Sequence, residues 1–179
     1  SGGGSSLLPL PVKGILFQKK ININKKLLES GANIDEINIV RKHLSQIKGG
    51  NFLKYCSPAN VHSLILSDVV GDNLSSISSG LTVPDPSRFY HSKKILKKYK
   101  LWENCDINIK DHINKGIKNT TLETPKKGNK IFKKSSNTII GSNSKSLEEI
   151  KSYCDKKNIQ SIIWKKNIKG DVKKVARMF

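Results

Sequence analysis

A short basic segment that ends in two glycines carries many of the residues able to do chemistry: Arg41, Ser45, Lys48, Gly49 and Gly50. Arg41 and Ser45 are four positions apart and share one face of a helix, and Lys48 follows about one turn later. Guanidinium, ammonium and hydroxyl groups bind carboxylate or phosphate, and the paired glycines can add bare backbone N–H donors. The segment therefore predicts an anion site. A solvated basic face near a helix C-terminus, where cations are favoured, explains the same residues.

Two segments rich in glycine and serine offer a second kind of anion contact, through the backbone. Glycine lets successive N–H groups turn toward one ligand, and the start of a helix that follows a strand favours an anion. The residues are Ser1, Gly2, Gly3, Gly4, Ser5, Gly141, Ser142 and Asn143. Taken alone, the first segment also fits a flexible tail, and the second fits an ordinary strand-to-helix turn.

Two carboxylates, Asp68 and Asp72, follow a short apolar run and lie in one loop. At the end of a buried strand, a carboxylate can hold Mg²⁺ or accept a proton from a sugar-acid hydroxyl group. We therefore predict that Asp68 is catalytic and that Asp68 and Asp72 are metal ligands. A loop cap at Asp68 and an Asx turn at Asp72 are the structural alternatives.

These residues need a scaffold of alternating strands and helices. Apolar periodicity and capping residues predict helices over 17–30, from Asn33 to about Ile47, from about Gly50 to before Pro58, and over 87–99, 144–157 and 171–179. Short apolar runs predict strands over 61–66, 137–140 and 160–164. The alternation favours an α/β fold, a Rossmann-like three-layer sandwich with a mostly parallel, incomplete sheet. Its ligands bind at the carboxyl ends of the strands, where Asp68, Asp72 and Asn143 lie.

The composition of the 179 residues leaves two explanations for a formal net charge of +19. A polyanion partner is one. The other is a set of solvated faces combined with the lysine, asparagine and isoleucine usage of an AT-rich genome. The arginines are few, at Arg41, Arg88 and Arg177, which weighs against nucleic acid. No apolar run is long enough to cross a bilayer, and three widely spaced cysteines predict neither zinc nor disulfides, so we expect a cytoplasmic protein.

Four segments together, 1–5, 41–50, 66–72 and 82–86, resemble the type-2 glycerate kinases. That family has a MOFRL-associated N-terminal domain and a C-terminal MOFRL domain. The resemblance implies Mg²⁺-dependent phosphoryl transfer from ATP to D-glycerate, giving 2-phosphoglycerate. It also implies that residues 1–179 are the central part of the N-terminal domain, without the MOFRL domain, and that this fragment alone is inactive.

The resemblance also suggests roles for the candidate residues. Ser1 to Ser5 and Gly141 to Asn143 are expected near phosphate, Arg41, Ser45 and Lys48 near glycerate or phosphate, and Lys48 is expected to be catalytic along with Asp68. The chain departs from the family pattern at four positions: Leu81, Asn73, Ser144 and Asp171. The changed charge at Asn73 or Ser144 is expected to weaken metal or phosphate binding.

Two other functions stay open at the level of sequence. A basic nucleic-acid-binding protein would use the lysines as contacts to phosphate that do not depend on sequence. Some relatives are labelled hydroxypyruvate reductase, but no GxGxxG motif follows a predicted strand here, which argues against a nicotinamide site.

Overall fold

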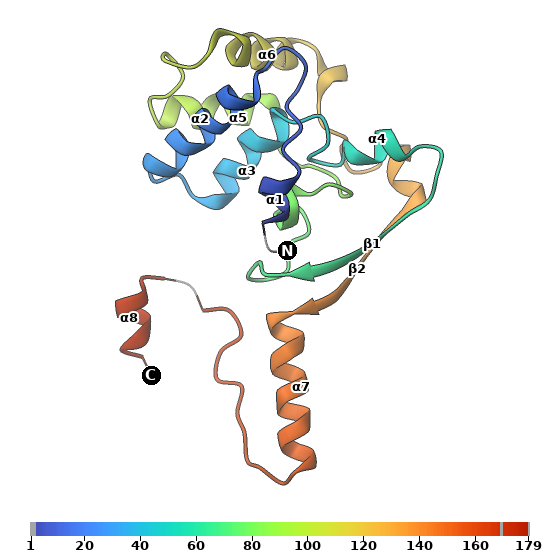
Figure 1. The fold of residues 1–179 in the computed structure, drawn as a ribbon, viewed down its shortest axis with the longest axis vertical. Helices are drawn as coiled ribbons and strands as arrows, with labels where there is room; N and C mark the ends of the chain where they lie inside the picture. Colours follow the sequence, from blue (N-terminus) through green and yellow to red (C-terminus); the bar gives the residue numbers. More distant parts are fainter. Residues whose placement is uncertain (1–2, 169, 179) are drawn as a thin grey trace.

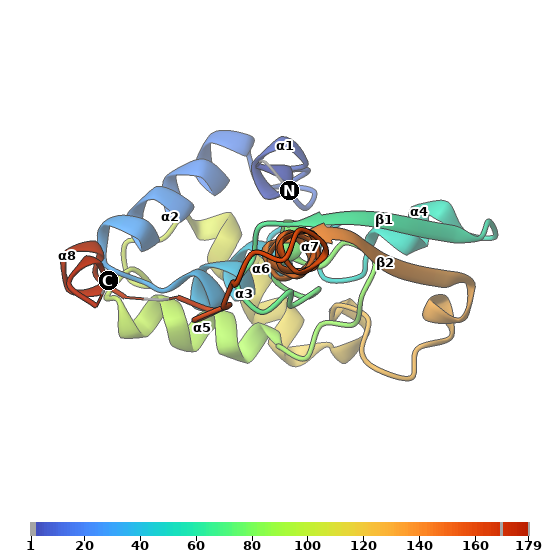
Figure 2. The same cartoon turned by 90° about the horizontal axis from the view of Figure 1, so that it is seen from below.

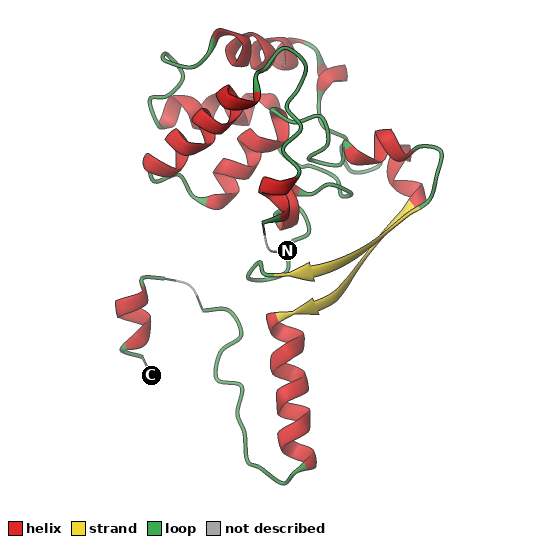
Figure 3. Cartoon of the chain, in the orientation of Figure 1, coloured by secondary structure: helices red, strands yellow, loops and turns green. Residues whose placement is uncertain are grey.

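A computed structural model describes residues 3–168 and 170–178. Ser1 and Gly2 of the predicted phosphate loop, and Phe179 of the predicted last helix, lie outside the described residues. The α-helices are α1 Gly4–Leu7, α2 Phe17–Glu29, α3 Ile34–His43, α4 Phe52–Cys56, α5 Phe89–Lys98, α6 Ile107–Lys118, α7 Asn143–Lys156 and α8 Val172–Ala176 (Figure 1). Short 3₁₀ helices are η1 Ile77–Ser79, η2 Thr120–Leu122 and η3 Lys130–Lys134, and the strands are β1 Val61–Ser67 and β2 Ser135–Ser142 (Figure 3).

The strands β1 and β2 pair in parallel, in a register that joins Val61 to Ser135 and Ser67 to Ser142. This confirms the predicted α/β class and the parallel sheet. The register shifts once, between Ile65 and Leu66. Because both strands end at the same edge, the residues that follow them, Asp68 and Asn143, leave the sheet on the same side, as predicted.

The third predicted strand, 160–164, is wrong, because these residues form no strand in the described chain. The segment instead runs back along α7 (Figure 1), where the Lys151 ammonium donates to the Ser161 carbonyl oxygen at 3.3 Å. Two of its apolar side chains are exposed, Ile162 by 83% and Trp164 by 54%, and Ile163 is half-buried. A short apolar run forms a strand only where a neighbouring strand is available to pair with it.

The core lies between α2, α3, α5 and α6, and is built from buried Ile, Leu, Val, Phe and Trp side chains. Helix α6 was not predicted, although Asp106 caps it by accepting from the Asn108 N–H at 3.0 Å. Its buried residues Ile109 and Ile113 are four positions apart, which is helical spacing. A Cβ at Gly116 of the same helix would overlap the ring of Phe89, so glycine lets α5 and α6 approach closely.

Helix α3 begins as predicted, with a capping box in which Asn33 and Glu36 bond each other's backbone N–H groups. It ends at His43, so Leu44 and Ile47 are buried just beyond the helix and not within it. Helix α5 begins one residue later than predicted, since Arg88 and not Ser87 is its N-cap.

The sheet leaves one apolar face uncovered in the described chain, with Leu64 71%, Leu66 56% and Ile140 52% exposed. Figure 2, in which α7 is seen almost end-on, shows the strands reaching out from the helical body. Within the described residues, no helix is long and apolar enough to cross a bilayer.

Candidate functional site

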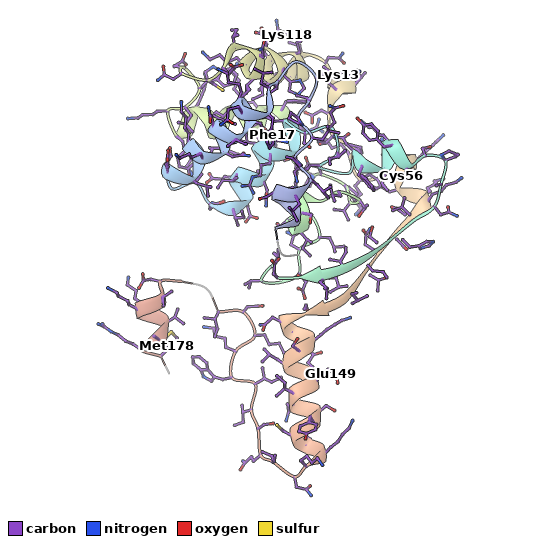
Figure 4. The ribbon with its side chains drawn as sticks, in the orientation of Figure 1. Lys13, Phe17, Cys56, Lys118, Glu149 and Met178 are labelled. Atoms are coloured by element: carbon purple, nitrogen blue, oxygen red, sulfur yellow. The ribbon has the colours of Figure 1, made fainter. Side chains whose placement is uncertain are left out.

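A cavity of about 330 Å³ lies between α2, the start of the chain and the end of the α3 region. Its polar lining includes Ser5, Lys20, Asn24, Arg41 and Lys48, and its apolar lining is Pro9, Phe17, Ile21 and Leu28. Figure 4 labels Phe17 at the start of α2, the helix that forms one wall. Two predicted residues of the basic segment, Arg41 and Lys48, therefore meet one predicted residue of the glycine-rich segment, Ser5.

Lys48 lines the cavity and is almost fully buried, with only 1% of its surface exposed. Its ammonium donates to the Ser5 carbonyl oxygen at 2.8 Å, to Ser5 Oγ at 3.2 Å and to the Ser78 carbonyl oxygen at 3.3 Å. Burial, together with the positive charge of Arg41, lowers the pKa of Lys48 from 10.5 to about 8. The ammonium is therefore held in place by oxygen atoms without being neutralised by a carboxylate.

Lys20 is the cation that sequence reasoning missed. It is 3% exposed, and its ammonium donates to the Pro9 carbonyl oxygen at 2.5 Å. Burial and the charges of Lys48 and Arg41 lower its pKa from 10.5 to about 7. The position of Lys20 in the sequence could have indicated that it is buried, because it lies on the same face of α2 as the buried residues Ile23 and Leu27.

Within residues 3–168 and 170–178, none of Lys20, Arg41 and Lys48 forms an ion pair with Asp or Glu, and no carboxylate lines the cavity. Burial also lowers the pKa of Arg41, although a guanidinium stays charged. Unpaired cations in a desolvated cavity create a strong positive potential. The arrangement fits a carboxylate or phosphate group.

The double glycine has a structural use that differs from the one predicted. The Gly49 N–H donates to the Ser79 carbonyl oxygen at 3.0 Å, and the Gly50 N–H donates to the Gly80 carbonyl oxygen at 2.7 Å. These donors are therefore not bare, as the prediction required. Both residues have positive φ, +61° and +83°, which explains why glycine is needed.

Ser45 also lies elsewhere than predicted. Since α3 ends at His43, Ser45 does not share a helical face with Arg41. Its hydroxyl donates to the Leu10 carbonyl oxygen at 3.0 Å, and it lines a separate cavity beside Lys42 and His43. Its structural role is to hold the segment before α2 against the end of α3.

In the glycine-rich start of the chain, Gly3 has φ +89° and its carbonyl oxygen accepts from the Ser6 and Leu7 N–H groups. The segment is anchored to η1, because Ser5 Oγ lies 2.7 Å from Ser79 Oγ. Gly4 packs so closely on Ser78 that a Cβ would overlap its hydroxyl oxygen. Ser5 alone of the predicted residues Gly3, Gly4 and Ser5 lines the cavity.

The predicted segment Gly141 to Asn143 marks the junction of β2 and α7, away from the cavity lining. Ser142 Oγ caps α7 by accepting from the Lys145 N–H at 3.3 Å, and the Asn143 amide donates to the Lys166 carbonyl oxygen at 3.2 Å. These contacts are those of a strand-to-helix turn. The structure does not gather this segment and the basic cavity into one site.

The two predicted metal ligands bracket a turn after β1. Asp68 is exposed, whereas Asp72 is half-buried with φ +54°, and its N–H donates to the Val69 carbonyl oxygen at 3.0 Å. The described part of the chain contains no group of three or more His, Cys, Asp or Glu side chains placed to hold a metal. Two carboxylates still suit Mg²⁺, which takes one or two from a protein and completes its shell with phosphate and water.

Comparison with known proteins assigns the chain to a family. Residues 1–114 match the family model described as a domain of unknown function, DUF4147. The chain belongs to the DUF4147 family. The match contains every residue that lines the basic cavity, whereas Gly141, Ser142 and Asn143 lie beyond it.

Relatives of this DUF4147 chain are named glycerate kinases, which confirms the predicted resemblance. It is 40% identical over 173 residues to a glycerate 2-kinase of Pyrococcus horikoshii, covering 97% of this chain and 38% of the relative. It is 37% identical to a D-glycerate 2-kinase of Thermotoga maritima, covering 99% of this chain and 39% of that relative. The chain therefore spans less than two fifths of each relative.

Two solved structures share the fold of the DUF4147 chain. A Pyrococcus horikoshii protein matches with a TM-score of 0.77 and 42% identity, covering 86% of this chain and 34% of that one. The glycerate kinase of Thermotoga maritima matches with a TM-score of 0.76 and 40% identity, covering 87% and 34%. At these identities, the likeness extends to both the sequence and the fold.

Proposed function

We propose that this chain forms part of an ATP-dependent glycerate 2-kinase, which transfers a phosphoryl group from ATP to D-glycerate and yields 2-phosphoglycerate. The observation that carries the proposal is a cavity in which Lys20, Arg41 and Lys48 have no carboxylate partner among the described residues. A fourth basic residue of the lining, Lys25, is exposed and lies 3.8 Å from Glu29. Membership of a family whose relatives are named glycerate kinases supports the reaction. The Pyrococcus horikoshii relative is much longer than this chain, and we propose that the complete active site also includes segments beyond the match.

The cavity has the chemistry that phosphoryl transfer requires of a protein. Catalysis of this reaction depends on positioning the anions and on neutralising negative charge. Arg41 can bind a carboxylate or phosphate through two parallel N–H donors. Lys48, fixed by Ser5 and Ser78, supplies a second charge whose position is set before the substrate arrives.

We also propose roles for the residues beside β1 and β2. Mg²⁺ would enter with ATP and be held by Asp68 and Asp72, neutralising charge on the phosphates. Asp68 would accept the proton of the attacking hydroxyl group. Backbone and side-chain donors at Gly3 to Ser5 and at Gly141 to Asn143 would lie near phosphate. The three unpaired, half-buried cysteines fit a reducing, cytoplasmic setting.

The test is ATP-dependent phosphorylation of D-glycerate with Mg²⁺. It compares this chain with a longer protein that joins it to the additional segments of the Pyrococcus horikoshii relative. We expect turnover in the longer protein only. In that protein, Arg41→Gln should lower kcat/KM at least about 100-fold, because it removes a charged, bidentate contact.

The matched control is Lys26→Gln, a charge lost from the exposed surface of α2, which should leave turnover unchanged. A folded longer protein without turnover would contradict the proposed reaction. Turnover that is insensitive to Arg41→Gln would instead contradict the assignment of the basic cavity to substrate binding.

A further inference from the structure

Asn24 lies one helical turn after Lys20 on α2, and both residues line the basic cavity. The four-residue spacing places the two side chains on the same face of the helix. The Oδ1 atom of Asn24 is buried and has no hydrogen-bond partner among the described residues. Leaving such an acceptor unpaired destabilises the folded chain. The cavity therefore contains an unpaired hydrogen-bond acceptor as well as the unpaired cations Lys20, Arg41 and Lys48.

The hydrogen bonds of the nearby ammonium groups go to other atoms. Lys20 donates to Pro9, and Lys48 donates to Ser5 and Ser78. An anion bound by these cations brings acceptor oxygens, which cannot satisfy Asn24 Oδ1. A hydroxyl group on the same anion can, because it donates a proton.

We infer that Asn24 recognises a hydroxyl group of the ligand, so that the cavity selects small hydroxylated anions over anions of equal charge without a hydroxyl group. The anionic group lies against Lys20, Arg41 and Lys48, and a hydroxyl group on the first or second carbon beyond it donates to Asn24 Oδ1. This inference rests on the proposed function and deepens it, since it names the feature by which a hydroxy acid is distinguished from a simple acid. Asn24 is thereby a specificity-determining residue.

We expect a large difference in affinity between an acid with a hydroxyl group and one without it. A site built to hydrogen-bond a hydroxyl group loses that bond with an analogue that lacks it, and its own polar atom stays unpaired. A loss of about 1.4 kcal/mol corresponds to about 10-fold in affinity. We therefore expect D-glycerate to bind about 10-fold more tightly than propionate, which has the same carboxylate and carbon number but no hydroxyl group.

The experiment is an NMR titration of the full chain with D-glycerate, propionate and inorganic phosphate. Asn24→Leu keeps the approximate shape of the side chain but removes the acceptor. It should lower the affinity for D-glycerate to that for propionate and leave propionate and phosphate binding unchanged. The control is Asn22→Leu, because Asn22 is exposed on the same helix and bonds Gln18 at 3.0 Å outside the cavity lining.

The fold of Asn24→Leu is checked by its thermal midpoint, which should not fall, since leucine is a good helix former and an unpaired buried acceptor is removed. The inference is overturned if Asn24→Leu retains the preference for D-glycerate, or if the native chain shows no preference while binding both acids. A different set of binding results would contradict the proposed function. The native chain would then bind phosphate but neither acid, or bind no anion at all, and either result would overturn the hydroxyl preference too.

Discussion

Replacing Lys20 by methionine should stabilise the fold while it weakens anion binding. Burial and the neighbouring cations lower the pKa of Lys20 from 10.5 to about 7. At about 1.4 kcal/mol per pKa unit, the charged side chain destabilises the folded state by about 5 kcal/mol. Methionine removes this cost but loses the bond to the Pro9 carbonyl oxygen, whose exposure to an apolar neighbour costs about 1–3 kcal/mol. We expect a net gain of about 3 kcal/mol in the free energy of unfolding at pH 6.

The gain should depend on pH in a defined direction. The folded pKa lies below the unfolded one, so between about pH 7 and pH 10.5 the unfolded state binds the proton that the folded state has released. The native protein therefore gains stability as the pH rises through this window. The advantage of Lys20→Met should shrink by about 3 kcal/mol between pH 6 and pH 9. The two proteins should then be about equally stable near pH 9.

The assay is urea unfolding at pH 6 and pH 9, followed by circular dichroism, with a phosphate titration at pH 6. The control, Lys26→Met, removes an exposed lysine of the same helix and should change neither stability nor its pH dependence. A variant that is less stable than the native protein at pH 6 would refute the reasoning. So would a gain that stays constant between the two pH values, because it would show that Lys20 is not desolvated.

Two further predictions concern a close glycine contact and a carboxylate with a lowered pKa. Gly50→Ala should destabilise the fold by about 2 kcal/mol or more in urea unfolding, because φ is +83° and the new Cβ would lie 2.8 Å from the Val83 carbonyl oxygen. Gly128→Ala, at φ +89° with open space around it, should cost only about 1 kcal/mol. Despite burial, hydrogen bonds from His43, the Phe89 N–H and Lys126 lower the pKa of Glu123 from 4.5 to about 2. Because the folded pKa is the lower one, this stabilisation exists above pH 4.5 and is lost as the pH falls toward 2. Acid unfolding of Glu123→Gln should lack that pH dependence, and an unchanged acid transition would contradict the assignment.

The sequence correctly predicted those helices and strands that are determined by residues close together in the chain. The capping box at Asn33 and Glu36, and the apolar run of β1, each contain the information that forms the element. The segment 160–164 has the short apolar run of a strand, but a strand also needs a partner, and α7 lies beside it instead. Local pattern cannot supply that information.

The candidate site could be predicted only in part, for a related reason. Arg41 and Lys48 carry charges near each other in sequence, so their joint role could be proposed and they do line one cavity. Lys20 and Asn24 come from another helix, and only tertiary packing brings them to the same place. A lysine in the buried stripe of α2 was the available clue, since a charged residue there must have a partner, a ligand or a lowered pKa.

The cations near the end of α3 fall into two groups, and the contrast argues for function. Lys42 lies 3.3 Å from Asp85, so this buried cation is paired with a carboxylate. The ring of the neighbouring His43 lies 3.3 Å from the Glu123 carboxylate. Arg41, Lys48 and Lys20 have no such partner in the described chain, although burial makes the absence costly. A chain that folds for stability alone would pair or replace them. Burying a cation without a carboxylate partner is costly, and this cost occurs in one cavity but not at Lys42, the residue next to Arg41. The simplest physical reason is that an anionic ligand binds in the cavity and pairs with these cations.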